Sequence, residues 1–265
     1  FDDLLKRWLL FKGFKVNQVI NITDIDDKLI EKSGGKKQKL KEITLKYTNL
    51  IFTKGPERSV QRNFGIQNTK GVYILYLDAD MILQGKVIEE CVLKCEKEKL
   101  IALYIPERII GKGFWIKVRD FERTFYNATC IDVVRFIRRD KFFEIGGFDE
   151  TLTGPEDWDF DKKVRKMGKT DIIHQPLYHN EANFHLKDYL KGKSYYAKTF
   201  SRYIEKWGKE DSDIKKQFGF FYRYLVVFME NGKWQRFFSQ PVFLLGLYYS
   251  KFLVGLNYLK YKFSK

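Results

Sequence analysis

Val72-Tyr73-Ile74-Leu75-Tyr76-Leu77-Asp78-Ala79-Asp80 is the stretch of this sequence that says most about the fold. Its first six residues form a short apolar run, which is typical of a strand buried inside a parallel sheet. Two aspartates follow the run directly. We therefore expect both carboxylates at the carboxyl edge of the sheet, where open α/β folds bind ligands.

The segments around this strand alternate between helical and extended patterns. We expect helices over residues 59–69 and 86–97, and strands over residues 49–53 and 100–105. This alternation indicates an α/β fold with an open, mostly parallel sheet and helices on its flanks. A chain of 265 residues with 44% hydrophobic content can bury the core of one such domain with appendages.

The charge of the chain is strongly positive. The formal net charge of +15 suits polyphosphate ligands, nucleic acid or an anionic membrane surface, and charge alone does not choose among them. The three cysteines are too few for a disulfide framework or a four-thiolate zinc site, which is consistent with a reducing compartment. We expect a structural role for them and a cytoplasmic protein.

The C-terminal residues 216–265 are rich in aromatic side chains and predict helices, among them 218–230 and 241–259. Residues 241–259 carry a single charge, Lys251, which would cost about 3 kcal/mol near the centre of a bilayer. A helix docked on the protein and a helix at a membrane interface both remain open. Five basic residues flank this segment: Lys233, Arg236, Lys260, Lys262 and Lys265. They suit the anionic inner face of a membrane, to which the chain would bind peripherally, and solvated lysines are the alternative.

Asp78 and Asp80 form an Asp-x-Asp pair that suits a divalent cation. If the segment is extended, residues i and i+2 point the same way and could share one Mg²⁺ or Mn²⁺ that bridges a diphosphate. The alternative is an acidic turn that only ends the strand.

The residues before this pair resemble a known signature. Gly55–Gly65, which contains Arg62-Asn63-Phe64-Gly65, then Lys70-Gly71 and the strand with its aspartates are similar to the metal-motif region of family-two glycosyltransferases. The resemblance implies a GT-A fold, a nucleotide-sugar donor and a metal held by Asp78 and Asp80. It also implies donor contacts for Arg58, Arg62, Asn63 and Asp78. The alternative places Arg58 and Arg62 on a solvated helix face.

A second block, Gly146–Glu150 followed by Gly154–Asp159, resembles the acceptor-side Glu-Asp motif of the same family. The resemblance makes Asp157 and Glu156 the catalytic residues, with Asp157 as the base that takes a proton from the acceptor hydroxyl and inversion as the outcome. Acids after Pro155 also make a good helix start, so capping explains part of the pattern. His179 resembles the late histidine that binds metal in some enzymes of this fold, and a hydrogen-bonded structural histidine is the alternative.

The N-terminal segment resembles a different family. Residues 1–16 and Asn21–Lys28 are similar to the catalytic domain of cysteinyl-tRNA synthetase, and this similarity ends near residue 52. The synthetase signatures His-Ile-Gly-His and Lys-Met-Ser-Lys-Ser are absent from the sequence, so we do not expect aminoacylation. The chain reads as a join of two coding sequences, with the glycosyltransferase resemblance starting near residue 54.

This join bears on the predicted sheet. The first strand of the GT-A sheet is not recognisable, so we expect a sheet that is incomplete at its N-terminal strand. We expect a helix over residues 2–11, a strand over 16–22 and a helix over 40–47. Our hypothesis is that residues 16–20 join the sheet of residues 73–77.

The predicted organisation has three parts. They are a synthetase-like segment (1–52), a GT-A-like domain (53–215) and a helical, membrane-associated region (216–265). The predicted function is inverting sugar transfer to a saccharide or lipid-linked acceptor of the cell envelope, impaired by the missing first strand. A non-catalytic or artefactual fusion is the alternative. An RNA-binding protein is a third, although no nucleic-acid motif supports it.

Overall fold

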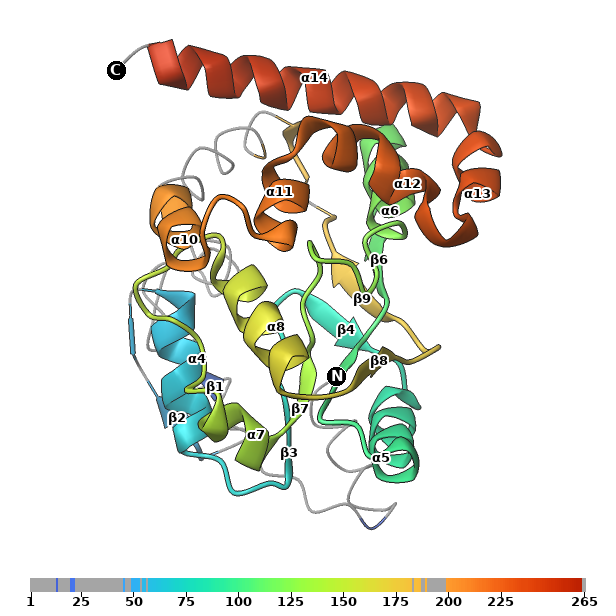
Figure 1. The fold of residues 1–265 in the computed structure, drawn as a ribbon. Helices are drawn as coiled ribbons and strands as arrows, with labels where there is room; N and C mark the ends of the chain where they lie inside the picture. The colour runs from blue at the N-terminus through green and yellow to red at the C-terminus, as the bar shows by residue number, and fades with distance from the viewer. Residues whose placement is uncertain are drawn as a thin grey trace. The chain divides into compact units, whose positions relative to one another are not determined.

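The computed structural model describes residues 57–182 and 199–263, together with residues 13, 20–21, 45, 49–52, 54–55, 184–186 and 189 (Figure 1). The helices predicted over residues 2–11 and 40–47 fall outside this set, apart from Leu45, which is helical.

The chain divides into two compact units. The first unit contains residues 1–74 and 138–150, and the second contains residues 75–137 and 151–265. The two sequence blocks of the predicted glycosyltransferase are therefore shared between the units.

The elements described in the first unit include a parallel strand pair and two helices: β1 (Ile20–Asn21), β2 (Ile51–Phe52), α4 (Arg58–Gln67) and α7 (Arg139–Glu144). The ring of Phe52 packs edge-on against Phe64 of α4, with the ring centroids 5.4 Å apart. The strand and helix predicted over residues 49–53 and 59–69 are thus confirmed within a few residues.

The strand β1 does not join the sheet that we expected. It pairs with β2, whereas β3 (Tyr73–Leu75) belongs to another sheet. The hypothesis that residues 16–20 extend the sheet of residues 73–77 is therefore wrong for Ile20, and residues 16–19 lie outside the described residues. The physical reason is that the backbone of Ile20 pairs with that of Ile51.

A four-stranded sheet has the order β3, β7 (Phe136–Arg138), β5 (Ala102–Tyr104) and β8 (Thr170–Ile172). The strand β5 runs parallel to β8 and antiparallel to β7. All three residues of β5 are buried, as expected for an inner strand.

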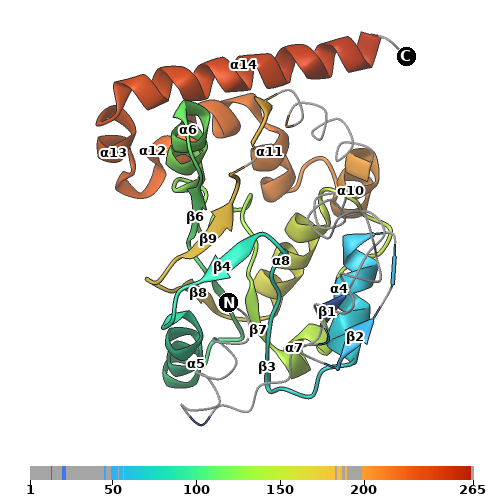
Figure 2. The ribbon, with the colours of Figure 1, turned by 180° about the vertical axis from the view of Figure 1, so that it is seen from behind.

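A three-stranded sheet has the order β4 (Met81–Leu83), β9 (Leu177–Asn180) and β6 (Glu107–Ile110). Its central strand β9 is antiparallel to β4 and parallel to β6. The chain therefore has the predicted α/β architecture, with strands of both directions in its sheets. Figure 2 shows β4, β9 and β6 side by side.

The second unit also contains most of the described helices. They are α5 (Val87–Glu98), α6 (Phe114–Arg123), α8 (Glu156–Met167), α10 (Phe200–Trp207), α11 (Ser212–Phe218), α12 (Val227–Met229), α13 (Trp234–Phe238) and α14 (Pro241–Phe263). The helix α5 buries Val87, Cys91 and Cys95 on one face. All three cysteines of the chain are free and buried.

The helix predicted over residues 218–230 is confirmed for residues 220–229, with a π-helical stretch in its middle. The chain there forms a π-helical turn η2 (Tyr222–Val226), the short α12 and a 3₁₀ turn η3 (Glu230–Gly232). Asn231 adopts a left-handed conformation with φ of 56°, which breaks the helical path.

The C-terminal helix α14 packs against α6, and both views show the two helices side by side (Figures 1 and 2). Lys251 is buried and its Nζ lies 2.9 Å from the Glu122 carboxylate of α6. A Cβ at Gly246 would lie within 2.8 Å of Val118 and Phe114, so this glycine permits the close approach. Among the described residues, no helix combines the length and apolarity needed to cross a membrane.

Candidate active site

The two motif aspartates lie in a turn and not on an extended strand. The strand β3 ends at Leu75, and the backbone N–H of Met81 donates to the carbonyl of Asp78 at 3.0 Å. The expectation that Asp78 and Asp80 point the same way as strand neighbours therefore does not hold. Both side chains are partly exposed.

The register of the three-stranded sheet explains which residues meet the Asp78–Asp80 turn. Met81, directly after Asp80, pairs with His179, and the backbone N–H of Asn180 donates to the Asp80 carbonyl at 2.8 Å. The Nε2 atom of His179 lies 3.2 Å from Asp80 Oδ1. The register thus joins the Asp-x-Asp motif to the late histidine.

Glu107 approaches the same histidine from the other neighbouring strand. His179 pairs with Ile109, and Glu107 lies two residues earlier on β6, so it projects from the same face of the sheet. The Nδ1 atom of His179 lies 3.0 Å from Glu107 Oε1. His179 is therefore held between two carboxylates.

Two arginines continue this network of charges. Arg135 Nη2 lies 3.5 Å from Glu107 and 3.7 Å from Asp78. Arg123 Nη2 lies 3.1 Å from Glu107 and 2.7 Å from Asp132. Alternating positive and negative side chains therefore link the Asp78–Asp80 turn to the end of α6.

The charges of the network shift the pKa values of its members. Burial disfavours the charged form of His179, but hydrogen bonds and charges from Asp80 and Glu107 outweigh burial and raise the pKa of His179 to about 10. Burial likewise opposes ionisation of Glu107, but Arg123, His179 and Arg135 hold the pKa of this carboxyl well below its usual value. His179 is therefore an imidazolium at neutral pH in this arrangement.

A cavity of about 200 Å³ opens beside the network. Nine residues line it: Glu107, Arg123, Ile131, Asp132, Val133, Arg135, Gly154, Asp157 and Trp158. Burial lowers the pKa of Arg135, but charges led by Asp78 and Glu107, with a smaller part from Asp157, outweigh burial and raise it. Asp157 thus lines the same cavity as Arg135, and Asp78 approaches Arg135 through an ion pair without lining the cavity itself.

The start of α8 separates the two residues of the Glu-Asp motif. Glu156 is only 1% exposed, and its carboxylate accepts a hydrogen bond from the backbone N–H of Gly154. Asp157 is partly exposed and lines the cavity. In this structure Glu156 therefore holds the loop before α8, while Asp157 faces the cavity.

Whether the site suits a divalent cation depends on its donor atoms. Carboxylates and an imidazole are ligands that Mn²⁺ accepts, and Glu107 holds Nδ1 of His179 as outer carboxylates hold metal-binding histidines. Within the described part of the chain, however, no three or more His, Cys, Asp or Glu side chains are grouped so that they could hold a metal ion. The predicted ligands Asp78, Asp80 and His179 suit a cation in chemistry, but in this structure they are arranged as ion pairs.

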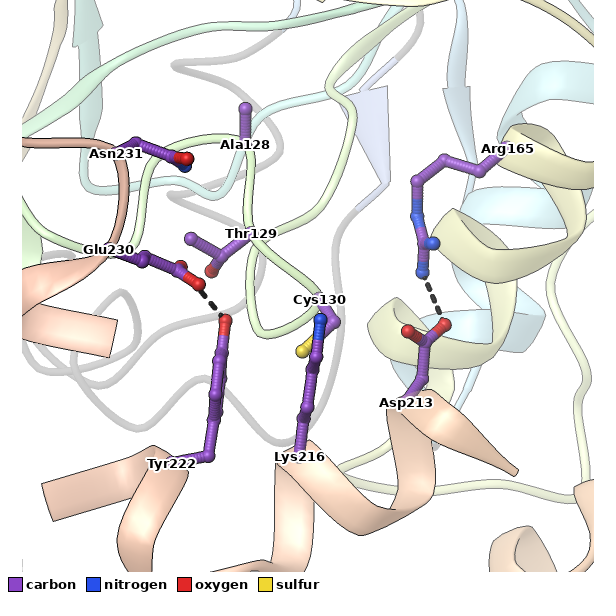
Figure 3. A pocket seen from close by; sticks show the side chains of 9 residues that line it. All are labelled: Ala128, Thr129, Cys130, Arg165, Asp213, Lys216, Tyr222, Glu230 and Asn231. Carbon is purple, nitrogen blue, oxygen red and sulfur yellow. Dashed lines mark hydrogen bonds and ion pairs between the residues drawn. The ribbon is translucent and has the colours of Figure 1, made fainter. Parts of the chain in front are cut away.

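A larger cavity of about 310 Å³ lies elsewhere in the second unit (Figure 3). Its charged side chains include Arg165, which lies 2.7 Å from Asp213, and Glu230, which accepts from the Tyr222 hydroxyl at 3.0 Å. None of the residues predicted for the active site lines this cavity. The smaller cavity is therefore the candidate active site.

The predicted donor residues of the first unit connect its two sequence blocks. Asn63 Nδ2 donates to the carbonyl of Phe148, and Asn63 Oδ1 accepts from the backbone N–H of Phe148, both at 2.9 Å. The Arg62 guanidinium lies 5.2 Å from the centroid of the Phe148 ring. Gly147 has φ of +64°, and a Cβ there would meet Asn63 at 2.7 Å. Asn63 and Arg62 thus hold the glycine turn of the second block, and Arg58 is half-buried at the start of α4.

Sequence reasoning missed four members of the network: Glu107, Arg123, Asp132 and Arg135. Two of them interrupt apolar runs, Glu107 after residues 101–105 and Arg135 within residues 133–137. Charged residues in buried strands are uncommon unless they are paired, so this interruption was the available signal.

Comparison with known families shows to which protein family the chain belongs. The model of glycosyl transferase family 2 matches residues 16–151, about half of the sequence. This chain belongs to glycosyl transferase family 2. The family match starts inside the segment that resembles the synthetase, whereas we predicted that it would start near residue 54.

Curated relatives confirm that the N-terminal segment resembles cysteinyl-tRNA synthetase. The chain is 46% identical to the cysteine–tRNA ligase of Chlamydia pneumoniae over 52 residues, which are 20% of this chain and 11% of that protein. It is 26% identical to the cysteine–tRNA ligase of Mesoplasma florum over 228 residues, which cover 80% of this chain and 47% of that protein. The chain thus spans a tenth to a half of the length of these relatives.

A solved mannosyltransferase supports the fold of this chain. The mannosyltransferase PcManGT from Pyrobaculum calidifontis, in complex with GDP-Man and Mn²⁺, aligns with a TM-score of 0.50 and 14% identity over 94% of this chain and 81% of its own. S. aureus TarS in complex with UDP-GlcNAc aligns with a TM-score of 0.46 and 15% identity over 74% of this chain and 62% of its own.

Proposed function

We propose that this family-2 chain transfers a sugar from a nucleoside-diphosphate sugar to an acceptor hydroxyl, with inversion at the anomeric carbon. One observation carries the proposal: Asp157 lines the same cavity as Arg135, and Asp78 approaches Arg135 through an ion pair. Sugar transfer needs both at one place, because Asp157 would accept the proton of the acceptor hydroxyl while the Asp78–Asp80 turn faces the diphosphate of the donor.

Asp157 is the base in this proposal. The acceptor oxygen forms its bond to the anomeric carbon, and its proton passes to Asp157. The bond between the anomeric carbon and the diphosphate oxygen breaks, and its electron pair leaves with the nucleoside diphosphate. Mg²⁺ or Mn²⁺ would offset the charge of that leaving group, and Asp78, Asp80 and His179 would hold it only after leaving their ion pairs and after His179 loses a proton.

The other motif residues support the site. Glu156 fixes the loop before Asp157 through Gly154. In the first unit, Arg58 and Arg62 are the proposed contacts for the donor phosphates, since guanidinium groups bind phosphate through a rigid fork. Asn63 contributes to the donor side by holding the backbone of Phe148. Weak donor binding is part of the proposal, because the segment before α4 resembles a synthetase.

The proposed acceptor is a saccharide or lipid-linked saccharide of the cell envelope, reached from the inner face of an anionic membrane. The net charge of +15 and the aromatic C-terminal helices support this choice. Nucleic acid is not the proposed partner.

The test is release of nucleoside diphosphate from a panel of UDP- and GDP-sugars, with Mg²⁺ or Mn²⁺ and with or without saccharide acceptors. We expect release above the protein-free rate with donors of one base. Absence of release with every donor and acceptor would contradict sugar transfer and favour a non-catalytic fusion.

A further inference from the structure

The helix α14 carries an apolar stripe that the rest of the described chain leaves largely exposed, although Tyr249 stacks on Trp115 of α6. The stripe consists of Val242, Leu245, Tyr249, Phe252 and Leu256. These residues recur at intervals of three and four, so they lie on one face of the helix. The side chains of Val242, Leu245 and Phe252 are 63%, 73% and 60% exposed.

The opposite face of α14 is fixed to the protein. Leu247 is fully buried, and Lys251 is held by Glu122 and lies over the rings of Tyr224 and Phe228. The helix is thus docked on one side and apolar on the other. A helix that is apolar all round is ordinarily buried on all sides, so most of the stripe lacks a covering partner in the described chain.

The preceding helix α13 adds aromatic side chains at the same end of the second unit. Trp234 and Phe238 are 52% and 60% exposed, and α13 packs against α14 (Figure 1). Tryptophan favours the boundary between water and lipid, because its ring is apolar and its N–H can remain hydrated.

The charge of this region selects among partners. Residues 231–265 contain six Lys or Arg and no Asp or Glu. An anionic surface would attract these residues. A second copy of the chain, meeting this one through the same face, would bring two acid-free basic segments together and be repelled.

We propose that the α14 stripe, with Trp234 and Phe238, is a docking face for the surface of an anionic lipid bilayer. The helix lies in the plane of the interface and inserts its stripe among the acyl chains near the headgroups, while Lys251 stays paired with Glu122. Any basic residue of segment 231–265 that the protein does not already hold would add attraction to the headgroups of about 1 kcal/mol. This inference deepens the membrane part of the proposed function, and its test does not depend on sugar transfer.

The test is cosedimentation with vesicles of phosphatidylcholine alone or with about a quarter phosphatidylserine. The wild type is compared with Leu245→Gln/Phe252→Gln and with Leu93→Gln/Val72→Gln, which changes two exposed apolar residues outside the stripe. We expect binding that requires phosphatidylserine, weakens in high salt, falls at least about tenfold in the stripe variant and is unchanged in the control variant.

Three outcomes would overturn the proposal. In the first, the wild type does not bind the anionic vesicles. In the second, the stripe variant binds them as well as the wild type does. In the third, no form binds vesicles, and the wild type and the control variant are dimers whereas the stripe variant is a monomer. Light scattering after gel filtration measures the dimer, and thermal unfolding shows that each variant is folded. Release of nucleoside diphosphate in solution is measured separately, so failure here leaves the proposed transfer standing.

Discussion

The ring nitrogen Nε2 of His179 lies 3.2 Å from the carboxylate of Asp80. The two residues are far apart in the sequence, and the pairing of β4 with β9 brings them together. This register also extends to Glu107 on β6, so one sheet brings three charged side chains together, and Glu107 lines the cavity of the candidate site.

Replacing the proposed base is expected to stop transfer without unfolding the protein. For Asp157→Asn we expect loss of about 100-fold or more of nucleoside diphosphate release in the presence of acceptor, because the amide cannot accept the proton. Donor affinity should change little. The control is Asp140→Asn, an exposed carboxylate on α7 that pairs with Arg138, and its rate should match the wild type. A fully active Asp157→Asn variant would exclude this residue as the base.

Arg135 is expected to be needed for both the fold and the site. It is 6% exposed, and among the described residues its Nη1 has no hydrogen-bond partner although Nη2 faces two carboxylates. For Arg135→Met we expect a loss of about 3 kcal/mol of unfolding free energy, because buried carboxylates lose their cation. Urea unfolding of the wild type and of Arg135→Met measures this difference in unfolding free energy.

Arg135→Lys separates charge from geometry. Lysine keeps the charge but lacks the planar fork, so we expect a folded protein with at least about tenfold slower release. The exposed Arg138→Lys is the control. Equal rates for Arg135→Lys and the wild type would show that only charge matters at this position.

Asn63 is expected to be a structural residue of the first unit. Asn63→Ala leaves the backbone N–H and carbonyl of Phe148 without their partners, so we expect a loss of about 2 kcal/mol of unfolding free energy. Asn68→Ala removes an exposed hydrogen bond to Phe64 and should cost clearly less. Urea unfolding measures both losses. Equal losses in the two variants would show that the hydrogen bonds of Asn63 to the Phe148 backbone do not stabilise the first unit.

The ion pair between Glu122 and Lys251 predicts a dependence of stability on pH. Burial opposes ionisation of Glu122, but Lys251 and Tyr126 outweigh it and lower the pKa of Glu122 to about 2. Since this pKa lies below the unfolded value of 4.5, the contribution is present above pH 4.5 and is lost as the pH falls towards about 2.

The measurement compares the wild type with Lys251→Met. We expect the variant to be less stable by about 3 kcal/mol at pH 7, because Glu122 would be buried without its cation. The difference should shrink between pH 4.5 and pH 3. A difference that is constant over this range would show that Lys251 contributes through packing alone.

Much of the fold could be predicted because helical periodicity and apolar runs depend on local sequence. The predictions of α4 and α5 agree with the structure within two residues at each end. The helix over residues 218–230 could also be predicted, but its π-helical stretch at residues 222–226 could not, because apolar periodicity does not distinguish a π-helical turn from an α-helical one. The prediction that residues 16–20 join the sheet of residues 73–77 was wrong for Ile20, since strand pairing depends on distant residues.

The same limit applies to the site. The motif residues Asp80 and Asp157 could be found from their resemblance to the family, whereas Glu107 and Arg135 could not. Their ion pairs arise across strands that only the sheet register brings together, and the register is not visible in composition or spacing.

Thermal unfolding with nucleoside diphosphates, with and without Mn²⁺, tests most directly whether the acids around Arg135 form a donor site. We predict that one nucleoside diphosphate raises the melting temperature only when Mn²⁺ is present. Asp80→Asn should abolish that rise, and Asp157→Asn should keep it. A wild type that shows no rise with any nucleotide, or a rise that survives Asp80→Asn, would contradict the account.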